Sequence, residues 1–547
     1  MSAEYKQPSA LTNEEKMARG SAWMTLGNVG SRLIGVIYIL PWYAWMGTHG
    51  KEANALFNMG YNVYALFLMI STAGIPAAIA KQVAYYNSKQ QYAQSQQLFK
   101  KALQFMGLIG LICAAIMYLA SPLLARLSGG GTELIPVMHS LSAAILIFPC
   151  MSVIRGYFQG NQNMQPYAMS QLVEQVIRVF YMLLATFIII KVMNGSYLTA
   201  VVQSTFAAFI GAIASLATLF YFLKKAQLTF EVQKEMSVPG EKLDTKALII
   251  DTIRQAIPFT IVGAGVTIYK LVDQGTYVHM MQSFTSYSKN QLIEQMAVFG
   301  GNPDKLTMVV IGLATSMAFT SLPLVTEAIT QKRYRDLAKL INNNFQLYAL
   351  LMFPATFGMI LLAYPLNTFF YEPDVLGSKV LVVACLSGLF VGLFMLTSST
   401  LQGMYYNRSA VRFFVAGLVV KIILQYPCIL LFQVYGPLIS TTIGMGASCY
   451  LNIRKLQRVS RFNWRFTLRR ILLIAILTLC MLIVALIAKA IGGLIFSPEH
   501  KLTAFLLSAF VAGFGGITYI YLILKTRIAE KLLGSSMIRL RQRLKIK

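Results

Sequence analysis

Long apolar runs, each about the length of a membrane-crossing helix, recur along almost the whole chain and constrain its fold more than any other feature. A hydrocarbon core about 30 Å thick needs roughly 20 apolar residues in helical conformation. Backbone polar groups find no water there, so such runs fold as helices. The predicted spans lie near residues 20–46, 55–80, 103–125, 134–154, 165–190, 197–223, 247–282, 306–330, 342–370, 379–403, 410–433, 436–453, 471–492 and 502–524. The sequence therefore predicts an all-α polytopic membrane protein of about fourteen transmembrane helices.

Composition and charge support this class and exclude others. The 547 residues are 56% hydrophobic and 12% charged, which is more apolar surface than a water-soluble fold can bury. A net charge of +27 would indicate nucleic-acid binding in a soluble domain, but here the cations form short tracts between apolar runs without aromatic platforms. We therefore expect membrane lipids, and no nucleic acid, as partners. The six cysteines show no ligand spacing, so we expect no metal and no cofactor.

The distribution of lysine and arginine predicts the orientation. Most of these residues fall in every second loop and in the tail from Lys525 to Lys547, and cations accumulate on the cytoplasmic side. We expect both termini in the cytoplasm of a bacterial cell, a multi-pass location in the plasma membrane, and a first span retained as an anchor. The basic amphipathic tail is predicted to lie on the anionic membrane surface, with a solvated tail as the alternative.

An internal repeat organises the chain. An offset of 243 residues carries Gln159-Gly160 onto Gln402-Gly403, Arg178 onto Lys421, and Ala120–Leu123 onto Ala363–Leu366. A nearby offset carries Ile75-Pro76 onto Leu322-Pro323. Two such halves are usual in alternating-access carriers. The predicted division is an N-terminal lobe at 1–224, a cytoplasmic linker at 225–246, a C-terminal lobe at 247–459, a terminal helix pair at 460–526 and a basic cytoplasmic tail at 527–547.

Charged residues inside the predicted spans are candidates for function, because a charge in the membrane is costly unless it is paired or hydrated. Arg32 lies near the middle of the first span and has no acid at helical contact spacing, which favours a position facing a wet cavity. In the seventh span Asp251 and Arg254, and further along Lys270 and Asp273, are spaced i, i+3. These two pairs are equally consistent with self-neutralisation on one helix face and with a cavity lining.

Three further cations have a structural interpretation, with a position lining the cavity as the alternative. Glu174 and Arg178 are spaced i, i+4 and are predicted to pair. Lys421 occupies the repeat position of Arg178, which favours a scaffold role within each lobe. Arg155 lies at the predicted cytoplasmic end of the fourth span, where cations are expected in any case.

No phosphate-binding loop, zinc-protease motif or nucleophile elbow is present, so an ATP-driven pump and an enzyme are not expected. Residues 155–178, which begin Arg155-Gly-Tyr-Phe-Gln-Gly, resemble the signature of the polysaccharide biosynthesis/SpoVB branch of the multidrug/oligosaccharidyl-lipid/polysaccharide exporter superfamily. Leu401-Gln-Gly-Met repeats part of it. The resemblance extends to the YtgP-like proteins and to MurJ-type lipid II flippases.

The resemblance implies a flippase that moves the undecaprenyl-pyrophosphate-linked peptidoglycan precursor, lipid II, to the outer leaflet. It also implies a cationic cavity lined by helices one, two, seven and eight, and a lipid-tail groove at the final helix pair. Ser31-Arg32-Leu33 resembles the opening of the family's first helix, and Asp304-Lys305-Leu306 resembles its entry into helix eight. Asp273 stands where the MurJ-type proteins have Asn, and Tyr38-Ile39 replaces their Arg-Asp pair. The expected substrate ligands are Arg32, Arg254, Lys270, Asp273 and Lys305.

Alternatives remain within and outside this family. A flippase for a capsular or teichoic-type lipid-linked glycan fits equally well, whereas a cation-coupled multidrug exporter would favour unpaired acids in the cavity. A membrane glycosyltransferase is disfavoured, because the largest predicted outer loop, 283–305, offers few acids. We expect a monomer, with cell-wall synthesis proteins as candidate partners.

Overall fold

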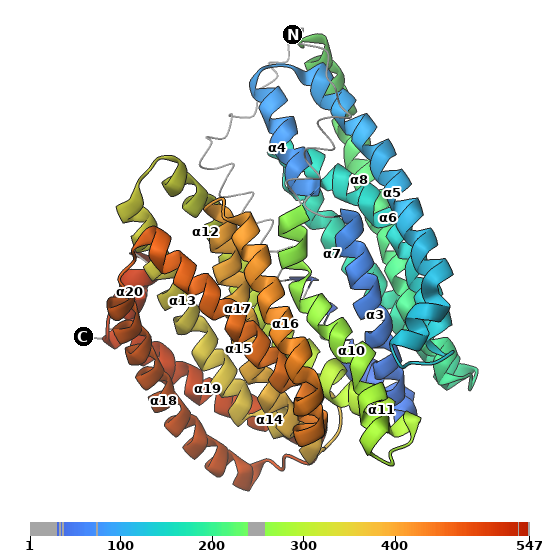
Figure 1. Cartoon of the computed structure of the whole chain (residues 1–547), viewed down its shortest axis with the longest axis vertical. Helices are drawn as coiled ribbons and strands as arrows, with labels where there is room; N and C mark the ends of the chain where they lie inside the picture. Colours follow the sequence, from blue (N-terminus) through green and yellow to red (C-terminus); the bar gives the residue numbers. More distant parts are fainter. Residues whose placement is uncertain are drawn as a thin grey trace, which may run out of the picture. The chain divides into compact units, whose positions relative to one another are not determined.

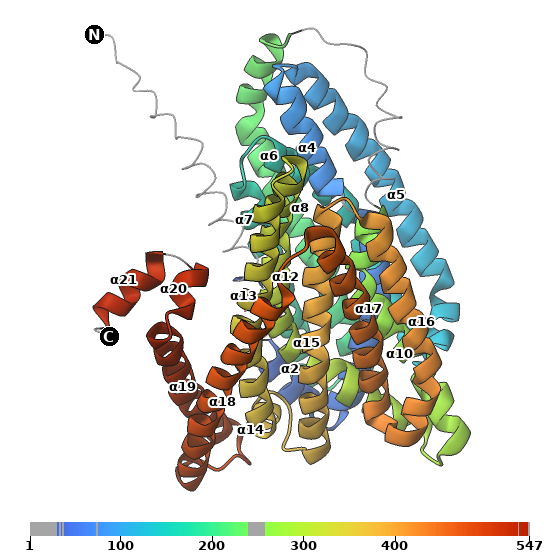
Figure 2. The ribbon, with the colours of Figure 1, turned by 60° about the vertical axis from the view of Figure 1, so that its left-hand side comes forward.

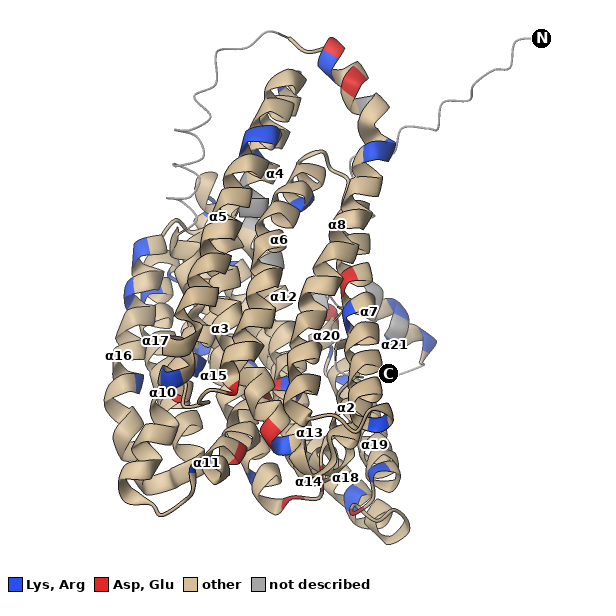
Figure 3. Ribbon diagram, turned by 90° about the vertical axis from the view of Figure 1, so that its right-hand side faces the viewer, with Lys and Arg blue, Asp and Glu red and all other residues tan. Residues whose placement is uncertain are grey.

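The computed structural model describes residues 30–31, 34–35, 38–72, 75–238, 257–533 and 535–544. Over these residues the chain is helical and contains no strand. Ten stretches of the described chain are long and apolar enough to cross a membrane, and one of them, Asn407–Ser460, comprises two helices that pack along each other. In Figure 3, α5 and α8 carry no charge over most of their length, and their charged bands lie near the ends. The chain is an all-α, multi-pass membrane protein.

The chain folds into two compact units. The first unit contains α2 and, from Gly60 onward, α3 together with the helices that follow up to α8. Within it α8 packs along α6 and α7, and α4 packs on α6 (Figure 1). Its described helices are α2 Ile39–Met46, α3 Gly50–Thr72, α4 Ile75–Ser88, α5 Tyr92–Leu127, α6 Leu134–Gly160, α7 Gln165–Phe187 with a π-turn at Ile188–Val192, and α8 Tyr197–Glu235.

The second unit contains the helices from α10 onward and the first turns of α3, up to Met59. Within it α12 packs on α15, α16 on α17, and α18 on α19. Its helices are α10 Gly265–Phe284, α11 Lys289–Met296, α12 Asn302–Thr330, α13 Tyr334–Leu361, α14 Ala363–Phe370, α15 Val375–Gly403, α16 Asn407–Phe432, α17 Gly436–Ser460, α18 Trp464–Ile495, α19 Lys501–Lys525, α20 Ile528–Leu533 and α21 Ser535–Arg543.

The internal repeat is visible in the backbone of the two units. The turn after α6 contains Gln162 at φ 58°, and the matching turn after α15 contains Tyr405 at φ 65°. The turns after α4 and α12 likewise contain Gln90 at φ 59° and Lys332 at φ 56°. Positive φ is uncommon for residues other than glycine. Its recurrence at matched turns therefore shows that the two units share one helix–turn plan.

Glycines let α7 and α8 of the first unit, and α16 and α17 of the second unit, approach closely. A Cβ on Gly211 of α8 would lie 3.1 Å from Cβ of Arg178, and a Cβ on Gly444 of α17 would lie 2.9 Å from Cβ of Lys421. Each glycine therefore lies against the cation at the repeat position of the neighbouring helix. The repeat preserves both the cation and the helix crossing that surrounds it.

Replacing Gly417 by alanine is expected to destabilise the second unit. The added Cβ would lie 1.9 Å from Ser448 Oγ and 2.4 Å from the backbone oxygen of Gly444. Such overpacking costs about 1–3 kcal/mol, which a lower midpoint of thermal unfolding would show. The matched control is Gly513→Ala in α19, where nothing lies within 4 Å and alanine should be neutral or stabilising. Equal midpoints for the two variants would contradict this account.

Several predicted boundaries differ from the structure. The segment predicted as a linker from residue 225 continues α8 as far as Glu235, since neither proline nor glycine interrupts it there. The predicted outer loop 283–305 contains α11 and a π-turn at Ala297–Gly301. The predicted span 55–80 is divided between α3, which ends at Thr72, and α4, which begins at Ile75.

The predicted span 342–370 is broken at Leu362 into α13 and α14. Pro365 lacks the backbone N–H that would bond to the carbonyl oxygen of Leu361. Lys489 of α18 supplies a donor instead, with its Nζ 2.7 Å from that oxygen. Lys489, the one cation inside the predicted spans 471–492 and 502–524, therefore satisfies a carbonyl that the proline leaves unpaired.

The C-terminal helices pack on one another rather than extending separately. Ile528 and Ala529 of α20 are buried in a cluster that includes Tyr519 and Ile523 of α19. Figure 2 shows α20 and α21 turning away from the end of α19. Part of the apolar face of the tail, which was predicted to contact the membrane, therefore packs against α19 instead. The basic face remains a predicted membrane contact.

Candidate functional site

The charged residues singled out in the sequence, both the expected substrate ligands and the possible structural or cavity charges, divide into three groups. Arg32, Arg254 and Asp251 lie outside the residues that the structure describes. Lys270, Asp273, Lys305 and Lys421 all belong to the second unit. Arg155, Glu174 and Arg178 belong to the first unit.

Lys270 and Asp273 lie one turn apart on α10, yet each forms an ion pair with a residue of another helix. Lys270 Nζ lies 2.5 Å from Asp304 Oδ2, in the first turn of α12. Asp273 Oδ1 accepts a hydrogen bond of 2.7 Å from Lys421 Nζ. Of the two alternatives left open for this pair, self-neutralisation of Lys270 and Asp273 is therefore wrong. Their i, i+3 spacing permits contact, but stronger partners on packed helices bind both side chains.

The first of these pairs belongs to a polar cluster at the start of α12. Lys305 Nζ donates to Asn54 Oδ1 at 2.8 Å and lies 5.4 Å from the ring centroid of Phe57. Asn54 is fully buried, and its amide donates to Asn302 Oδ1 at 2.5 Å. A buried amide that is hydrogen-bonded on both sides holds neighbouring groups in a fixed geometry. The Lys305 ammonium is thus positioned by a buried asparagine of α3.

The asparagines of this cluster were not singled out by the sequence-based reasoning. Asn58 extends the network, donating to the backbone oxygen of Asn54 at 2.6 Å and to its Oδ1 at 2.8 Å. The available signal was the pair Asn54 and Asn58, spaced i, i+4 within an otherwise apolar span. Polar side chains in a membrane helix tend to face the protein interior or a wet cavity.

We call Lys270, Asp304, Lys305 and Asn54 the α10–α12 cluster. It contains two ammonium groups and one carboxylate, which leaves a positive charge in excess. The side chains of Lys270 and Asp304 are 24% and 25% exposed, so they are reachable from outside the protein. An accessible, net cationic cluster with amide neighbours is suited to binding an anion such as a phosphate.

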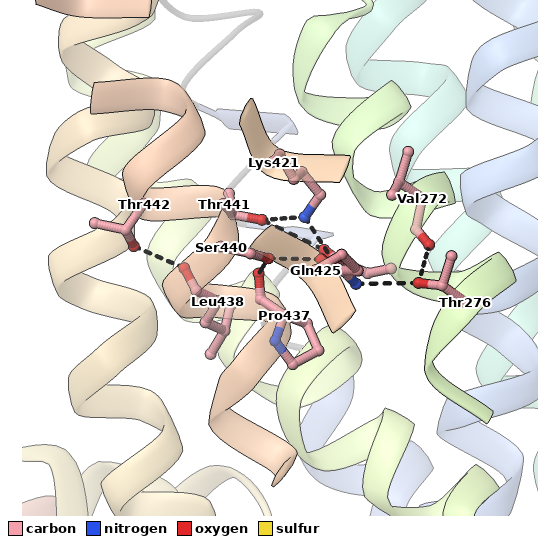
Figure 4. Close-up of polar contacts among 10 residues, drawn as sticks. Val272, Thr276, Lys421, Gln425, Pro437, Leu438, Ser440, Thr441 and Thr442 are labelled. Atoms are coloured by element: carbon pink, nitrogen blue, oxygen red, sulfur yellow. Dashed lines mark hydrogen bonds and ion pairs between the residues drawn. The ribbon is translucent and has the colours of Figure 1, made fainter. Parts of the chain in front are cut away.

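The second ion pair, between Lys421 and Asp273, is more deeply buried than the α10–α12 cluster and has no net charge. The Lys421 side chain is 0% exposed, and Asp273 is 12% exposed. Lys421 Nζ also donates to Thr441 Oγ1 at 2.5 Å, and Gln425 Nε2 donates to Asp273 Oδ1 at 2.9 Å. Figure 4 shows Lys421 and Gln425 of α16 meeting Ser440 and Thr441 of α17. The geometry is that of a junction joining α10, α16 and α17.

The first unit contains a third charged group, in which two arginines share one carboxylate. Glu174 accepts hydrogen bonds from Arg178 at 2.8 Å and from Arg155 at 2.9 Å. Arg155 also donates to Ser170 at 3.0 Å and to Ser215 at 2.9 Å. The Arg155 side chain is only 13% exposed. The sequence marked Arg155 as a possible structural or cavity charge at the end of the fourth span, and helix packing brings it to the Glu174–Arg178 pair.

Comparison with known proteins extends these observations. A family model described as "Polysaccharide biosynthesis protein" matches residues 17–328, and one described as "MatE" matches residues 301–427. The lipid II flippase MurJ of Bacillus subtilis is 32% identical over 532 residues, which cover 95% of this chain and 97% of that protein. Stage V sporulation protein B of the same organism is 29% identical over 185 residues, covering 34% of this chain and 35% of that protein.

Solved structures share the fold at lower identity. The inward closed conformation of a lipid II flippase MurJ has a TM-score of 0.62 at 16% identity and covers 91% of this chain and 99% of its own. An inward-facing MATE family multidrug transporter has a TM-score of 0.60 at 14% identity, and the match covers 80% of this chain and 98% of that one. Both the fold and the 32% identity over most of the length agree with the family match. The chain belongs to the polysaccharide biosynthesis protein family, a MurJ-like branch of the multidrug/oligosaccharidyl-lipid/polysaccharide exporter superfamily.

Proposed function

We propose that this protein is a flippase that moves lipid II from the inner to the outer leaflet of the bacterial plasma membrane by alternating access. The observation that carries the proposal is its match along nearly the whole length of a lipid II flippase. The α10–α12 cluster supports it, because a pyrophosphate crossing the membrane needs compensating cations along a hydrated path. Arg32 and Arg254 are proposed as further cations of this path.

The two compact units fit a rocking mechanism, in which repeated halves expose one site alternately to each side of the membrane. The isoprenoid tail can remain in lipid while the headgroup crosses. Large apolar side chains of α18, among them Leu472, Ile476, Leu479 and Leu494, are exposed and supply a surface for that tail. Both termini are proposed to lie in the cytoplasm, in agreement with the positive-inside rule.

Complementation tests the substrate directly. Expressed in a bacterium depleted of its own lipid II flippase, this protein should restore growth and the labelling of lipid II at the outer leaflet. A transport-inactive variant expressed to the same level serves as the control. Growth arrest with lipid II retained on the inner leaflet, despite normal insertion of the protein, would refute the proposal.

A flippase for another lipid-linked glycan is the second candidate, favoured by the 29% identity to Stage V sporulation protein B. In that case lipid II labelling would stay low, and a different glycan would disappear from the cell surface on deletion. The "MatE" match supports the shared fold. A drug exporter is disfavoured, however, because Asp273, Glu174 and Asp304 are each paired with a cation.

A further inference from the structure

The arginine cluster of the first unit contains more positive charge than its own carboxylate balances. Among the described residues, Glu174 is the one acid that pairs with Arg155 and Arg178. Arg178 lies thirteen residues into the span Gln165–Val192, which at 1.5 Å per residue is ~20 Å from its start. An uncompensated charge at such a depth is costly, so a further anion would stabilise this cluster.

Polar atoms without partners gather at the same place. Arg178 Nε, Gln171 Oε1 and Tyr64 Oη are buried and have no hydrogen-bond partner among the described residues. Gln171 and Arg178 are two turns apart on one face of α7. Tyr64 is only 3% exposed. Unsatisfied buried groups cost free energy. Arg178 Nε and the Tyr64 hydroxyl are donors, so a ligand with acceptor oxygens would supply the partner that each of them lacks.

Tyrosines of neighbouring helices complete this region. The phenols of Tyr38, Tyr61 and Tyr64 lie near the Arg178 guanidinium. The Tyr61 and Tyr64 rings lie edge to face, with centroids 5.5 Å apart. Phenolic hydroxyls and a guanidinium N–H are all donors that phosphate oxygens accept from readily.

We propose that Arg178 and Tyr64 form a binding site for a phosphate group inside the first unit, with the unpartnered Arg178 Nε and Tyr64 hydroxyl as its donors. The phosphate is carried either by an isoprenoid pyrophosphate or by an ordinary anionic phospholipid. The first carrier rests on the proposed function, whereas the site itself does not. Glu174 accepts from both arginines and so orients Arg178, leaving its Nε to face the ligand.

The test uses the intact purified protein in detergent, with farnesyl pyrophosphate and dioctanoyl phosphatidylglycerol as separate probes. Arg178→Gln should weaken binding of at least one probe by about tenfold or more, the effect of losing a hydrogen bond to a charged group. It should still fold, because Arg155 continues to neutralise Glu174. Arg333→Gln, at an exposed arginine paired with Glu327, is the matched control and should bind like the wild type.

A second variant keeps the test valid if Arg178→Gln fails to fold. Tyr64→Phe removes only the unpartnered hydroxyl. It should weaken probe binding several-fold while leaving the probe-free protein at least as stable, because an unsatisfied buried group is lost. Tyr181→Phe on α7 is the control, since that hydroxyl already donates to Gln203 at 2.7 Å. Unchanged affinity for both probes in Tyr64→Phe would overturn the site.

The outcomes separate this site from the proposed function. If phosphatidylglycerol binding depends on Tyr64 while complementation fails, the site holds a membrane lipid and the flippase proposal falls. If complementation succeeds while neither probe distinguishes Tyr64→Phe from the wild type, the site is refuted and the flippase proposal stands. If Tyr64→Phe weakens the binding of farnesyl pyrophosphate but not of phosphatidylglycerol, the phosphate in this site is carried by an isoprenoid.

Discussion

Replacing Lys421 by methionine will lower the free energy of unfolding by about 3–5 kcal/mol, the cost of leaving a buried charge unpaired. The substitution removes the ammonium that lies 2.7 Å from Asp273 Oδ1. Gln425 and Thr441 would still donate to the carboxylate, but neither supplies a positive charge. A large fall in the midpoint of thermal unfolding of the purified protein measures the effect.

The double variant Asp273→Asn with Lys421→Met is the control for this prediction. It removes both charges, and replacing a buried ion pair by neutral groups is often close to neutral. We therefore expect the double variant to recover most of the stability that Lys421→Met loses. Losses that simply add in the double variant would show that the two side chains act independently, against the close pairing in the structure.

Replacing Lys305 by alanine will reduce transport by roughly 10- to 100-fold. A hydrogen bond to a charged group contributes about 1.5–3 kcal/mol, and each 1.4 kcal/mol is about tenfold. Lys305→Arg should retain part of the activity, because it keeps the positive charge. Lys379→Ala, at an exposed lysine in the first turn of α15, is the matched control. Flipping in proteoliposomes and binding of farnesyl pyrophosphate are the two measurements.

Replacing Asp304 by asparagine is expected to change the affinity for farnesyl pyrophosphate in the opposite direction to Lys305→Ala. Removing this carboxylate releases Lys270 from its 2.5 Å partner and takes one negative charge out of the α10–α12 cluster. Affinity for the anionic probe should therefore rise, whereas in Lys270→Ala it should fall. If the pair were purely structural, both variants would lose stability and neither would change affinity in a direction set by charge. Equal affinity in the two variants would contradict the anion-binding role.

The sequence by itself determined the class of fold, because the length and frequency of apolar runs depend only on composition along the chain. The repeat was also readable, since Gln159-Gly160 and Gln402-Gly403 mark turns whose backbone recurs in both units. Several predicted spans match a helix within a few residues, such as 379–403 in α15 and 502–524 in α19, and others lie inside a longer helix, such as 103–125 in α5. The exceptions arise where helix breaks depend on local chemistry, such as Pro365 and the donor that Lys489 supplies.

Only the tertiary structure decided which charges meet. Spacing made Lys270 and Asp273 candidates for each other, whereas helix packing gave them Asp304 and Lys421, which lie 34 and 148 residues away in the chain. Arg155 had no local partner that marked it, and the local partner of Asn54, Asn58, did not show its role. Both roles came from contacts with other helices. A helical period predicts which side chains share a face of one helix. Partners across helices depend on packing distances that no spacing along one helix encodes.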